Sequence, residues 1–394
     1  MTWTHRGKVA IAGVGFSAID RRTRTPLGAY ALSAAKAAVE DCGLSLKDVD
    51  GLATYPPAPF VGAVNRDGED IITVEFFLNR PEFGEIKWYS QAGEGLVVTA
   101  VRDAVNALIA GACTYALVWR AMYVPPGTYG RGELDAVVGD DQFTAPYGCI
   151  SPLQWHALVY RHYLDTYGAK REAMAALVLN SRRNANRNDH AIFAERTLSQ
   201  EEYLAARMIS EPLCLFDCDV PVTACVAVVL TTAERARDLP RPPAYVAAAS
   251  QQTANRSIPI HYTLTDHIAS GRPFADRLWA DAGRGPKDMS AVQLYDGFAP
   301  STWYWLESAG FCGRGEAHAF VQDGRIALDG ELPDNTFGGA LSQGRLHGMG
   351  HLAEAVLQVS DRAGPRQIPG AEAVAVFDGS PMLRGSAVVI TRNP

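Results

Sequence analysis

The sequence predicts an α/β protein built from two similar halves. Apolar runs with strand character alternate with longer runs that have helical spacing, which is the pattern of repeated βαβ units. A short segment of the first half recurs in the second, and a proline-rich linker, Leu239–Pro243, lies between them. We therefore expect an N-terminal half at residues 1–238 and a C-terminal half at residues 244–394.

The first half opens with a buried strand at Lys8–Val14 and a helix at Leu27–Asp41, followed by Gly43, a residue suited to end a helix. A second strand is predicted at Val49–Tyr55. The region from there to Trp88 is irregular and has room for an edge hairpin. The half continues with a buried helix at 96–110, a strand at 114–120 and, after an interruption, a strand at 220–231.

That interruption, residues 122 to about 210, reads as an insertion. It contains a loop rich in glycine and proline, Pro125–Gly139, and then a polar helical stretch with several arginines. Long insertions of this kind often shape binding clefts. We expect it to lie over the first half.

The repeat supports a duplicated fold. Asp41–Tyr55 aligns without gaps on Asp281–Tyr295, with identical Asp, Gly, Lys, Asp and Tyr residues. In both halves a glycine-containing stretch, a buried helix and a strand come later; in the second half these are 344–358 and 373–377. A duplicated βαβ-type half is the economical explanation.

Composition excludes several function classes. The net charge of −7 and the lack of a Lys/Arg run argue against nucleic-acid binding. The N-terminus enters a strand without a signal-peptide pattern, and no apolar stretch is long enough to span a membrane. The seven cysteines form no CxxC pair, which favours reduced thiols in a cytoplasmic protein.

A glycine-rich loop near the C-terminus is the best candidate for a ligand site. Phe337–Gln358 reads FGGALSQGRLHGMGHLAEAVLQ, with a helical pattern from Leu352. Glycines let the backbone approach a ligand, and the following helix points free N–H groups at it. The alternative is a turn with two surface histidines. We assign substrate binding or catalysis to this group: Gly338, Gly339, Gly344, Gly348, His347 and His351.

Several segments resemble the sterol-carrier-type thiolase-like proteins of the thiolase superfamily. They are KVAIAGVG (8–15), DCGLSLKDVDGL (41–52), residues 203–234, LYDGFAPSTWYWLESAGFC (294–312), FGGALSQG (337–344) and the final AVVITR. The resemblance covers nearly the whole chain. It implies an α/β thiolase fold, in which duplicated βαβαβαββ halves form a five-layered αβαβα core.

The chain departs from thiolases at the positions that carry their chemistry. The turn at 89–95 holds no nucleophilic cysteine, and residues 377–387 hold no second cysteine. The Gly-His-Pro of thiolases aligns with Gly344-Arg345-Leu346. A cysteine-dependent acyl transfer is therefore not expected.

These losses resemble a subgroup, the steroid side-chain-cleaving aldolases of the lipid-transfer-protein type. The resemblance implies retro-aldol cleavage of a β-hydroxyacyl-CoA to a ketone and propionyl-CoA. It also implies a homodimer that joins a small partner, with an oligonucleotide-binding-type barrel and a zinc ribbon, into a heterotetramer. The subgroup has a tyrosine where this chain has Arg345.

A retro-aldol cleavage needs a base for the β-hydroxyl proton and donors for the enolate oxygen. No lysine stands out as a buried amine, and no carboxylate joins His347 and His351 at metal-ligand spacing. An oxyanion hole is then the expected stabiliser, with no metal and no cofactor beyond the coenzyme A of the substrate.

Tyr295 is the first candidate for acid–base chemistry, since Arg345 or His347 can supply the cation that a phenol needs near neutral pH. The alternative is a core tyrosine at a strand end. Asp296 either orients a partner or, more simply, caps a helix. Asp219 either approaches the site, as the resemblance implies, or hydrogen-bonds the loop.

Arg345 cannot act as a base, so its expected role is to bind the thioester oxygen or a phosphate. Whether Tyr295 or His347 moves the proton stays open. Two other functions remain as alternatives: a non-catalytic subunit that binds acyl-CoA or scaffolds a complex, and a thiolase with a displaced nucleophile.

Overall fold

A computed structural model describes residues 3–55, 66–92, 96–123, 137, 142–251, 267–382 and 385–394. Three predicted features lie partly outside these residues: the region before Trp88, the end of the turn at 89–95, and most of the loop Pro125–Gly139.

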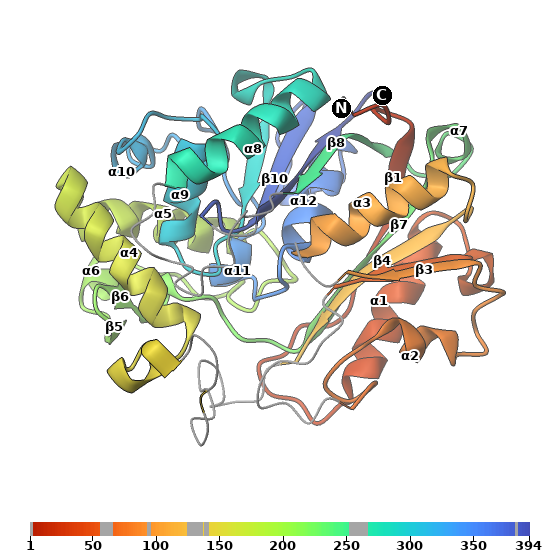
Figure 1. Ribbon diagram of the computed structural model, residues 1–394, viewed down its shortest axis with the longest axis horizontal. Coiled ribbons are helices and arrows are strands. Elements are labelled where there is room, and N and C mark those ends of the chain that lie inside the picture. The colour runs from red at the N-terminus through yellow and green to blue at the C-terminus, as the bar shows by residue number, and fades with distance from the viewer. Residues whose placement is uncertain are drawn as a thin grey trace.

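Within the described residues, the main strands form one mixed sheet in the order β3-β2-β4-β7-β1-β8-β11-β10-β9 (Figure 1). The two halves of the sheet are joined by a short antiparallel ladder between β1 and β8. The strands are β1 (Val9–Phe16), β2 (Gly51–Thr54), β3 (Trp88–Gln91), β4 (Ala116–Met122), β7 (Ala224–Thr232), β8 (Ala244–Gln251), β9 (Ala291–Leu294), β10 (Ala373–Gly379) and β11 (Gly385–Thr391).

Strand order is the same in the two halves. Counting outward from the junction, each half has its first strand, then its last strand running antiparallel to it, and then its parallel strands. In the second half, a single bridge between Val292 and Asp334 stands where the first half has β3. The topology is that of a duplicated half.

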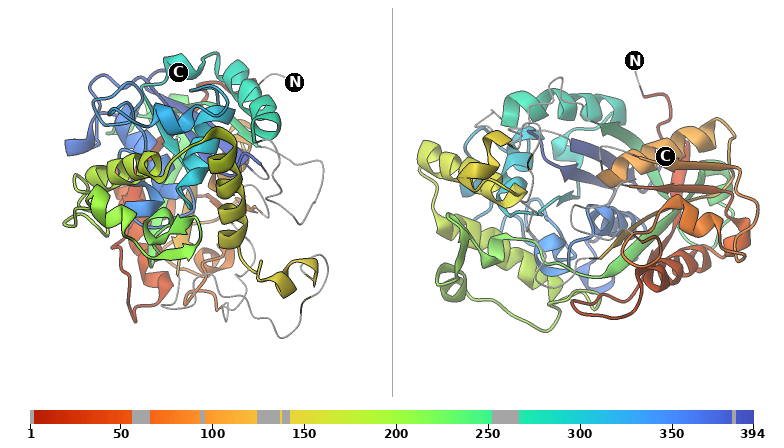
Figure 2. Two further views of the ribbon diagram at one scale, coloured as in Figure 1. Left: turned by 90° about the vertical axis from the view of Figure 1, so that its left-hand side faces the viewer. Right: turned by 60° about the horizontal axis from the view of Figure 1, so that its bottom comes forward.

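Four helices complete a five-layered arrangement (Figures 1 and 2). The outer helix α1 (Leu27–Asp41) packs on β1, β4 and β7, and α8 (His267–Ala282) packs on β8 and β11. Between the halves, α3 (Leu96–Ile109) and α12 (Met349–Val359) each contact strands of both. The predicted five-layered αβαβα core is therefore confirmed.

The repeated segments 41–55 and 281–295 fold alike. Each leaves a helix through a left-handed glycine, with φ 75° at Gly43 and 64° at Gly283, and enters a parallel strand after a short 3-10 turn. In both turns an aspartate accepts a hydrogen bond from the backbone three residues earlier. The sequence repeat is thus a structural repeat.

The insertion packs on the second half, so the expectation that it lies over the first half was wrong. Its helices α4 (Pro152–Tyr167), α5 (Arg171–Ala185) and α6 (Gln200–Leu204) lie beside α9 (Pro300–Ser308), α10 (Ala317–Phe320) and α11 (Gly339–Ser342) (Figure 1). Their aromatic and aliphatic side chains share one core with the tryptophans of α9. Burial of that apolar surface decides the placement.

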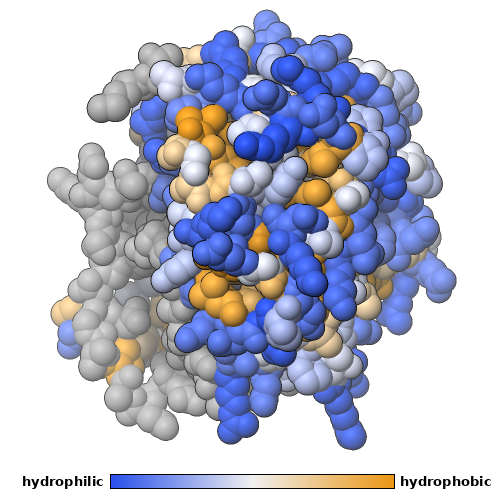
Figure 3. All heavy atoms as spheres, turned by 90° about the vertical axis from the view of Figure 1, so that its right-hand side faces the viewer, coloured by the Kyte–Doolittle hydropathy of each residue, from blue (hydrophilic) through white to orange (hydrophobic). Residues whose placement is uncertain are grey.

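Two predictions near this edge of the sheet need correction. The region before Trp88 contains the helix α2 (Val74–Leu78), and the first residues of the predicted turn at 89–95 belong to the parallel edge strand β3. Tyr89 on β3 is 61% exposed. The face on this side of the molecule is mostly hydrophilic with separate hydrophobic spots (Figure 3).

The smaller elements are α2 (Val74–Leu78), β5 (Met208–Ser210), β6 (Leu213–Cys214) and α7 (Ala233–Ala236). No helix in the described ranges combines the length and apolarity needed to cross a membrane.

Candidate active site

The candidate site lies at the carboxyl ends of parallel strands from both halves, where α3 and α12 begin. Tyr295 directly follows β9, and its backbone N–H donates to Phe377 on β10 over 2.8 Å. Arg120 lies near the end of β4, and the loop before α12 supplies Arg345 and His347. Strand ends of this kind commonly bind ligands in α/β proteins.

Tyr295, Arg345 and Asp219 form one connected group. Arg345 hydrogen-bonds the Tyr295 phenol, and Arg345 Nε lies 3.2 Å from Asp219 Oδ2. Asp219 is anchored because its backbone N–H donates to Gly297 over 3.1 Å. Burial raises the pKa of Tyr295 above its usual value, and the Arg345 guanidinium opposes that rise. The phenol therefore carries its proton near neutral pH.

His347 is held as a neutral imidazole. Arg120 Nη2 lies 3.3 Å from His347 Nδ1. A guanidinium can only donate, so Nδ1 accepts and the ring proton sits on Nε2. Burial lowers the pKa of His347 well below its usual value, and the guanidinium groups of Arg345 and Arg120 lower it further. His347 also has φ 43°, an uncommon backbone conformation that marks a constrained position.

Arg120 was missed by the sequence reading. Its side chain is buried, its guanidinium donates to the Tyr55 carbonyl oxygen, and burial lowers its pKa to about 10, so it stays charged at neutral pH. With Arg345 it surrounds His347 and Tyr295 with positive charge, which suits a developing oxyanion. The usable signal was an arginine inside the apolar strand ALVWRAM.

Asp378 was also missed. It is fully buried on β10, where its Oδ1 accepts from the Gly379 N–H over 2.9 Å, and the Val97 N–H at the start of α3 favours its ionised form. Burial raises its pKa to about 8. The usable signal was a carboxylate in the apolar run AVAVFDG, close to where thiolases carry the second cysteine.

Asp296 and His351 hold the loop together. Asp296 Oδ1 accepts from the Ala340 N–H over 2.7 Å, and Oδ2 accepts from the Leu341 N–H over 3.2 Å. His351 Nε2 lies 3.0 Å from Asp296 Oδ1, and His351 belongs to α12. Asp296 therefore has both of the roles considered for it: it accepts from N–H groups at the start of α11, and it pairs with His351.

The glycines of the loop make room for the protein's own side chains. A Cβ on Gly338, Gly339 or Gly344 would lie 2.7, 2.0 or 2.8 Å from a neighbouring side chain. A Cβ on Gly348 would lie 2.1 Å from Asp378 Oδ2. The close approach that we expected toward a ligand is therefore, on this side of each glycine, an approach toward protein; the neighbours are Ala185, Asp296, Val222 and Asp378.

The two thiols that interact with site residues, Cys218 beside Asp219 and Cys225 beside Arg120, lack the features of a nucleophile, and burial raises the pKa of both. Cys225, on β7, interacts electrostatically with Arg120, but its side chain is buried. Burial raises the pKa of this thiol, and the residue lies within a strand, away from any helix N-terminus. All seven cysteines are unpaired. Among the described residues, no three His, Cys, Asp or Glu side chains are grouped so that they could hold a metal.

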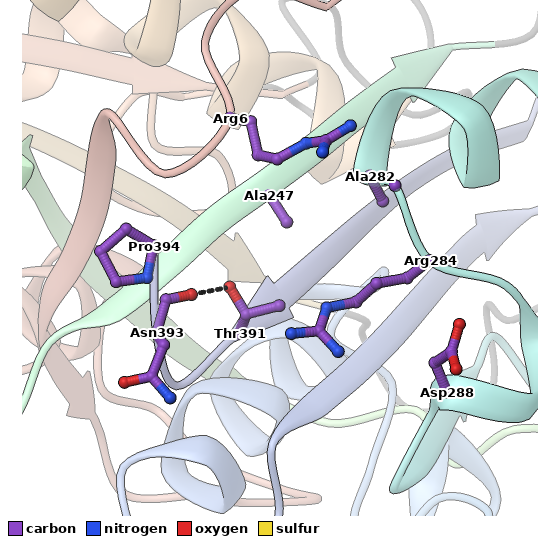
Figure 4. Close-up of a pocket in the computed structure, with 9 residues that line it drawn as sticks. Arg6, Ala247, Ala282, Arg284, Asp288, Thr391, Asn393 and Pro394 are labelled. Atoms are coloured by element: carbon purple, nitrogen blue, oxygen red, sulfur yellow. Dashed lines mark hydrogen bonds between the residues drawn. The ribbon is translucent and has the colours of Figure 1, made fainter.

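Two hollows in the described surface do not open onto Tyr295, His347 or Arg345. One, of about 390 Å³, lies between the chain termini and the end of α8, and Arg6 and Arg284 line it (Figure 4). The other, of about 310 Å³, is bounded by β1, α12 and Arg366. Neither is lined by Tyr295, His347 or Arg345. The candidate site is therefore identified by the chemistry and contacts of its side chains, and not by the size of a cavity.

Comparisons with known proteins agree with this geometry. A family model described as "Thiolase C-terminal domain-like" matches residues 252–393. The steroid side-chain-cleaving aldolase of Thermomonospora curvata is 33% identical, over 89% of this chain and 90% of that protein. The 17-hydroxy-3-oxo-4-pregnene-20-carboxyl-CoA lyase of Mycobacterium tuberculosis is 32% identical, over 95% of this chain and 97% of that protein.

Solved structures give the same result. The Ltp2-ChsH2(DUF35) aldolase has a TM-score of 0.84 and 31% identity, with 98% of each chain covered. A monomeric SCP2-thiolase-like protein type 1 from Mycobacterium smegmatis has a TM-score of 0.72 at 20% identity, over 98% of this chain and 78% of that one, which bears on the fold alone. The chain belongs to the thiolase superfamily, in the sterol-carrier-type thiolase-like family that includes the steroid side-chain-cleaving aldolase.

Proposed function

We propose that this protein is a carbon–carbon lyase that cleaves a β-hydroxyacyl-CoA of the steroid side-chain type by a retro-aldol reaction. The products are a ketone and propionyl-CoA. The observation that carries the proposal is a thiolase frame in which a phenol, a neutral imidazole and two guanidinium groups gather where an activated thiol is absent. Two relatives with over 30% identity are named for cleavage of this kind.

Tyr295 is the proposed acid–base group for the β-hydroxyl. Tyr295 and Arg345 are partly exposed, whereas His347, Arg120 and Asp219 are buried, so the first two are the more accessible to a substrate. When the β-hydroxyl loses its proton, its C–O bond becomes the ketone and the adjacent C–C bond breaks. Because the phenol carries its own proton near neutral pH, it can accept this one only after it has passed its own proton on. Arg345 donates to the phenol oxygen and so lowers the cost of forming that phenolate.

His347 and the guanidinium groups are the proposed stabilisers of the enolate. The electron pair from the broken C–C bond moves onto the thioester oxygen, where a preorganised donor lowers the barrier most. His347 offers its Nε2–H as such a donor because Nδ1 is committed to Arg120. His347 is therefore proposed as a donor and not as the base.

Physical reasons argue against both alternative functions. A thiolase with a displaced nucleophile needs an activated thiol, whereas burial raises the pKa of both thiols that interact with site residues, Cys218 and Cys225. A subunit that only binds acyl-CoA has no need for the buried guanidinium that fixes the tautomer of His347, or for the strained backbone there. Catalysis accounts for both features.

The proposed assembly has two supports: an open edge of the sheet, and a similar solved structure that contains a second component. Within the described residues β3 pairs only with β2, and Tyr89 beside that open edge is exposed, which fits pairing of two copies into a homodimer. The structural neighbour's title names a second component, ChsH2(DUF35). We infer a comparable small partner here. The unpaired cysteines fit a cytoplasmic setting.

A cleavage assay tests the proposal. The protein is incubated with 17-hydroxy-3-oxo-4-pregnene-20-carboxyl-CoA, with and without its co-purifying proteins, and ketone and propionyl-CoA are measured. Tyr295→Phe is expected to lower turnover by about 10²–10⁴-fold, the usual contribution of a general acid–base group. Tyr304→Phe is the control, because Tyr304 is a fully buried tyrosine of the α9 core whose hydroxyl has no hydrogen-bond partner among the described residues. Equal turnover by the Tyr295→Phe variant, or no products from the wild type with every partner tried, would overturn the proposal.

A further inference from the structure

We propose that Asp378 is the acid that delivers a proton to the α-carbon of the enolate, a role that no other group described above fills. The inference rests on the proposed lyase function. It concerns the second half of the reaction, after the C–C bond has broken, and it assigns a carboxyl group to that step.

The first support is where the carboxyl group lies. The two central helices, one from each half, both start beside Asp378: the Val97 N–H of α3 acts on its carboxyl, and Gly348, the N-cap of α12, lies directly against Oδ2. Gly348 has φ 81°, and a Cβ there would overlap the carboxylate. The loop is therefore built to leave space for this one side chain.

The second support is an unused oxygen atom. Asp378 Oδ1 accepts from the Gly379 N–H, whereas Oδ2 is buried and has no hydrogen-bond partner among the described residues. Buried polar atoms are nearly always paired, so an orphan oxygen needs an explanation. If the carboxyl group served only to hold the start of α3, nothing would explain why its second oxygen is buried without a partner.

The third support is the electrostatic setting. Asp378, when ionised, raises the pKa of the Tyr295 phenol, and the Arg120 guanidinium in turn lowers the pKa of Asp378. The carboxyl group thus belongs to the same cluster as the proposed base and the proposed enolate donors. Burial raises the pKa of Asp378 to about 8, so the group holds a proton at neutral pH and can release it within the working range.

The proposed step balances without a co-reactant. In cleavage, the enolate electron pair forms a C–H bond at the α-carbon with the Asp378 proton, the thioester carbonyl re-forms, and Asp378 becomes a carboxylate. The proton that Tyr295 takes from the β-hydroxyl, or one from water, restores the acid. In reverse, the Asp378 carboxylate removes an α-proton from propionyl-CoA.

That reverse step provides a test that does not need C–C cleavage. Propionyl-CoA is incubated with the full-length protein in D₂O, and deuterium at the α-carbon is followed by mass spectrometry. Wild type is expected to exchange, with a rate that rises with pH through about 8 as the carboxylate forms. Asp378→Asn is expected to exchange at least about 100-fold more slowly, the lower range for loss of a general acid–base group. Asp50→Asn is the control, a buried carboxylate that accepts backbone N–H bonds elsewhere in the first half.

The outcomes separate this inference from the lyase proposal. In a single turnover of the β-hydroxyacyl-CoA, Asp378→Asn is expected to form ketone with a smaller loss than its loss of α-exchange. Exchange within threefold of wild type, equal losses in both assays, or no exchange by wild type would overturn the role of Asp378. Exchange that depends on Asp378 in a protein that releases no ketone would support Asp378 and reject the lyase.

Discussion

His347 shows how one hydrogen bond decides a chemical role. Its Nδ1 accepts from Arg120, so Nε2 carries the proton, and its pKa lies well below the usual value because of burial and the two guanidinium groups. A neutral imidazole with a fixed tautomer is a donor. The histidine considered in the sequence as a possible base is therefore better suited to hold an enolate oxygen.

Two substitutions separate the donor role from the base role. His347→Gln keeps an N–H near the position of Nε2, whereas His347→Ala removes it. We expect His347→Ala to lower kcat by about 10²–10³-fold, the usual cost of one oxyanion-hole donor, and His347→Gln to recover part of that loss. The measurement is ketone release with a steroid β-hydroxyacyl-CoA between pH 6 and 9. Because the pKa of His347 is lowered, no loss of rate that follows histidine protonation is expected near pH 6.5. Equal losses in the two variants would identify a base instead.

Individual site residues could be read from the sequence only where a motif carried them. The YDGF and GRLHG motifs led to Tyr295, Arg345 and His347, and the structure brings these three together. Arg120 and Asp378 sit inside apolar strands, where sequence patterns report burial and nothing of chemistry. Only the packing of β4, β10 and the two central helices makes them neighbours of Tyr295.

At the scale of elements, the junction between the glycine-rich loop and α12 is the most constrained. Gly348 combines φ 81° with a Cβ position 2.1 Å from Asp378 Oδ2. Gly364, at φ 59°, shares the left-handed backbone but has nothing within 4 Å of its Cβ position. The two glycines therefore separate backbone strain from crowding.

Alanine at each position tests this junction. Gly364→Ala is expected to cost about 1–2 kcal/mol in the free energy of unfolding, the price of a left-handed non-glycine residue. Gly348→Ala should cost about 1–3 kcal/mol more, because the new methyl group displaces the Asp378 carboxyl. Urea unfolding gives both values, and α-exchange should fall in the Gly348→Ala variant alone. Equal costs and equal exchange would show that the carboxyl group moves aside freely.

The sequence predicted where helices and strands lie along the chain better than it predicted which of them pack together. Helical spacing gave α1 and α3, and apolar runs gave β1, β4 and β10, because burial on one or both faces leaves a direct pattern. The placement of α4 and α5 did not follow. Their apolar faces pack on the tryptophans of α9, more than a hundred residues away in the chain, and periodicity contains no information on which surface a helix will cover.

At the scale of the whole molecule, the two duplicated halves together bury the candidate site. The central helices α3 and α12 are enclosed between the two sheet halves, and their N-termini meet at a carboxyl group that water does not reach. Such a fold retains an acid near neutrality at a cost to its own stability. That cost depends on pH and can be measured.

The sign of the effect follows from the raised pKa. In the unfolded chain Asp378 loses its proton near pH 3.9, whereas in the folded protein it keeps it up to about pH 8. Between these values the folded state binds the extra proton, so its stabilising effect is fully present below the unfolded pKa and is lost as pH rises toward 8. The contribution of this group to the free energy of unfolding falls by about 1.4 kcal/mol per pH unit over that window and is constant above it.

Asp378→Asn, a neutral mimic of the protonated carboxyl group, removes this dependence. We expect the stability of the variant relative to wild type to rise by a total on the order of a few kcal/mol between pH 5 and pH 9. Urea unfolding of both proteins across that range measures the difference, and titrations elsewhere cancel because the two chains share them. A relative stability that stays flat from pH 5 to pH 9 would mean that Asp378 is ionised in the folded protein, and it would remove the acid on which proton delivery to the enolate depends.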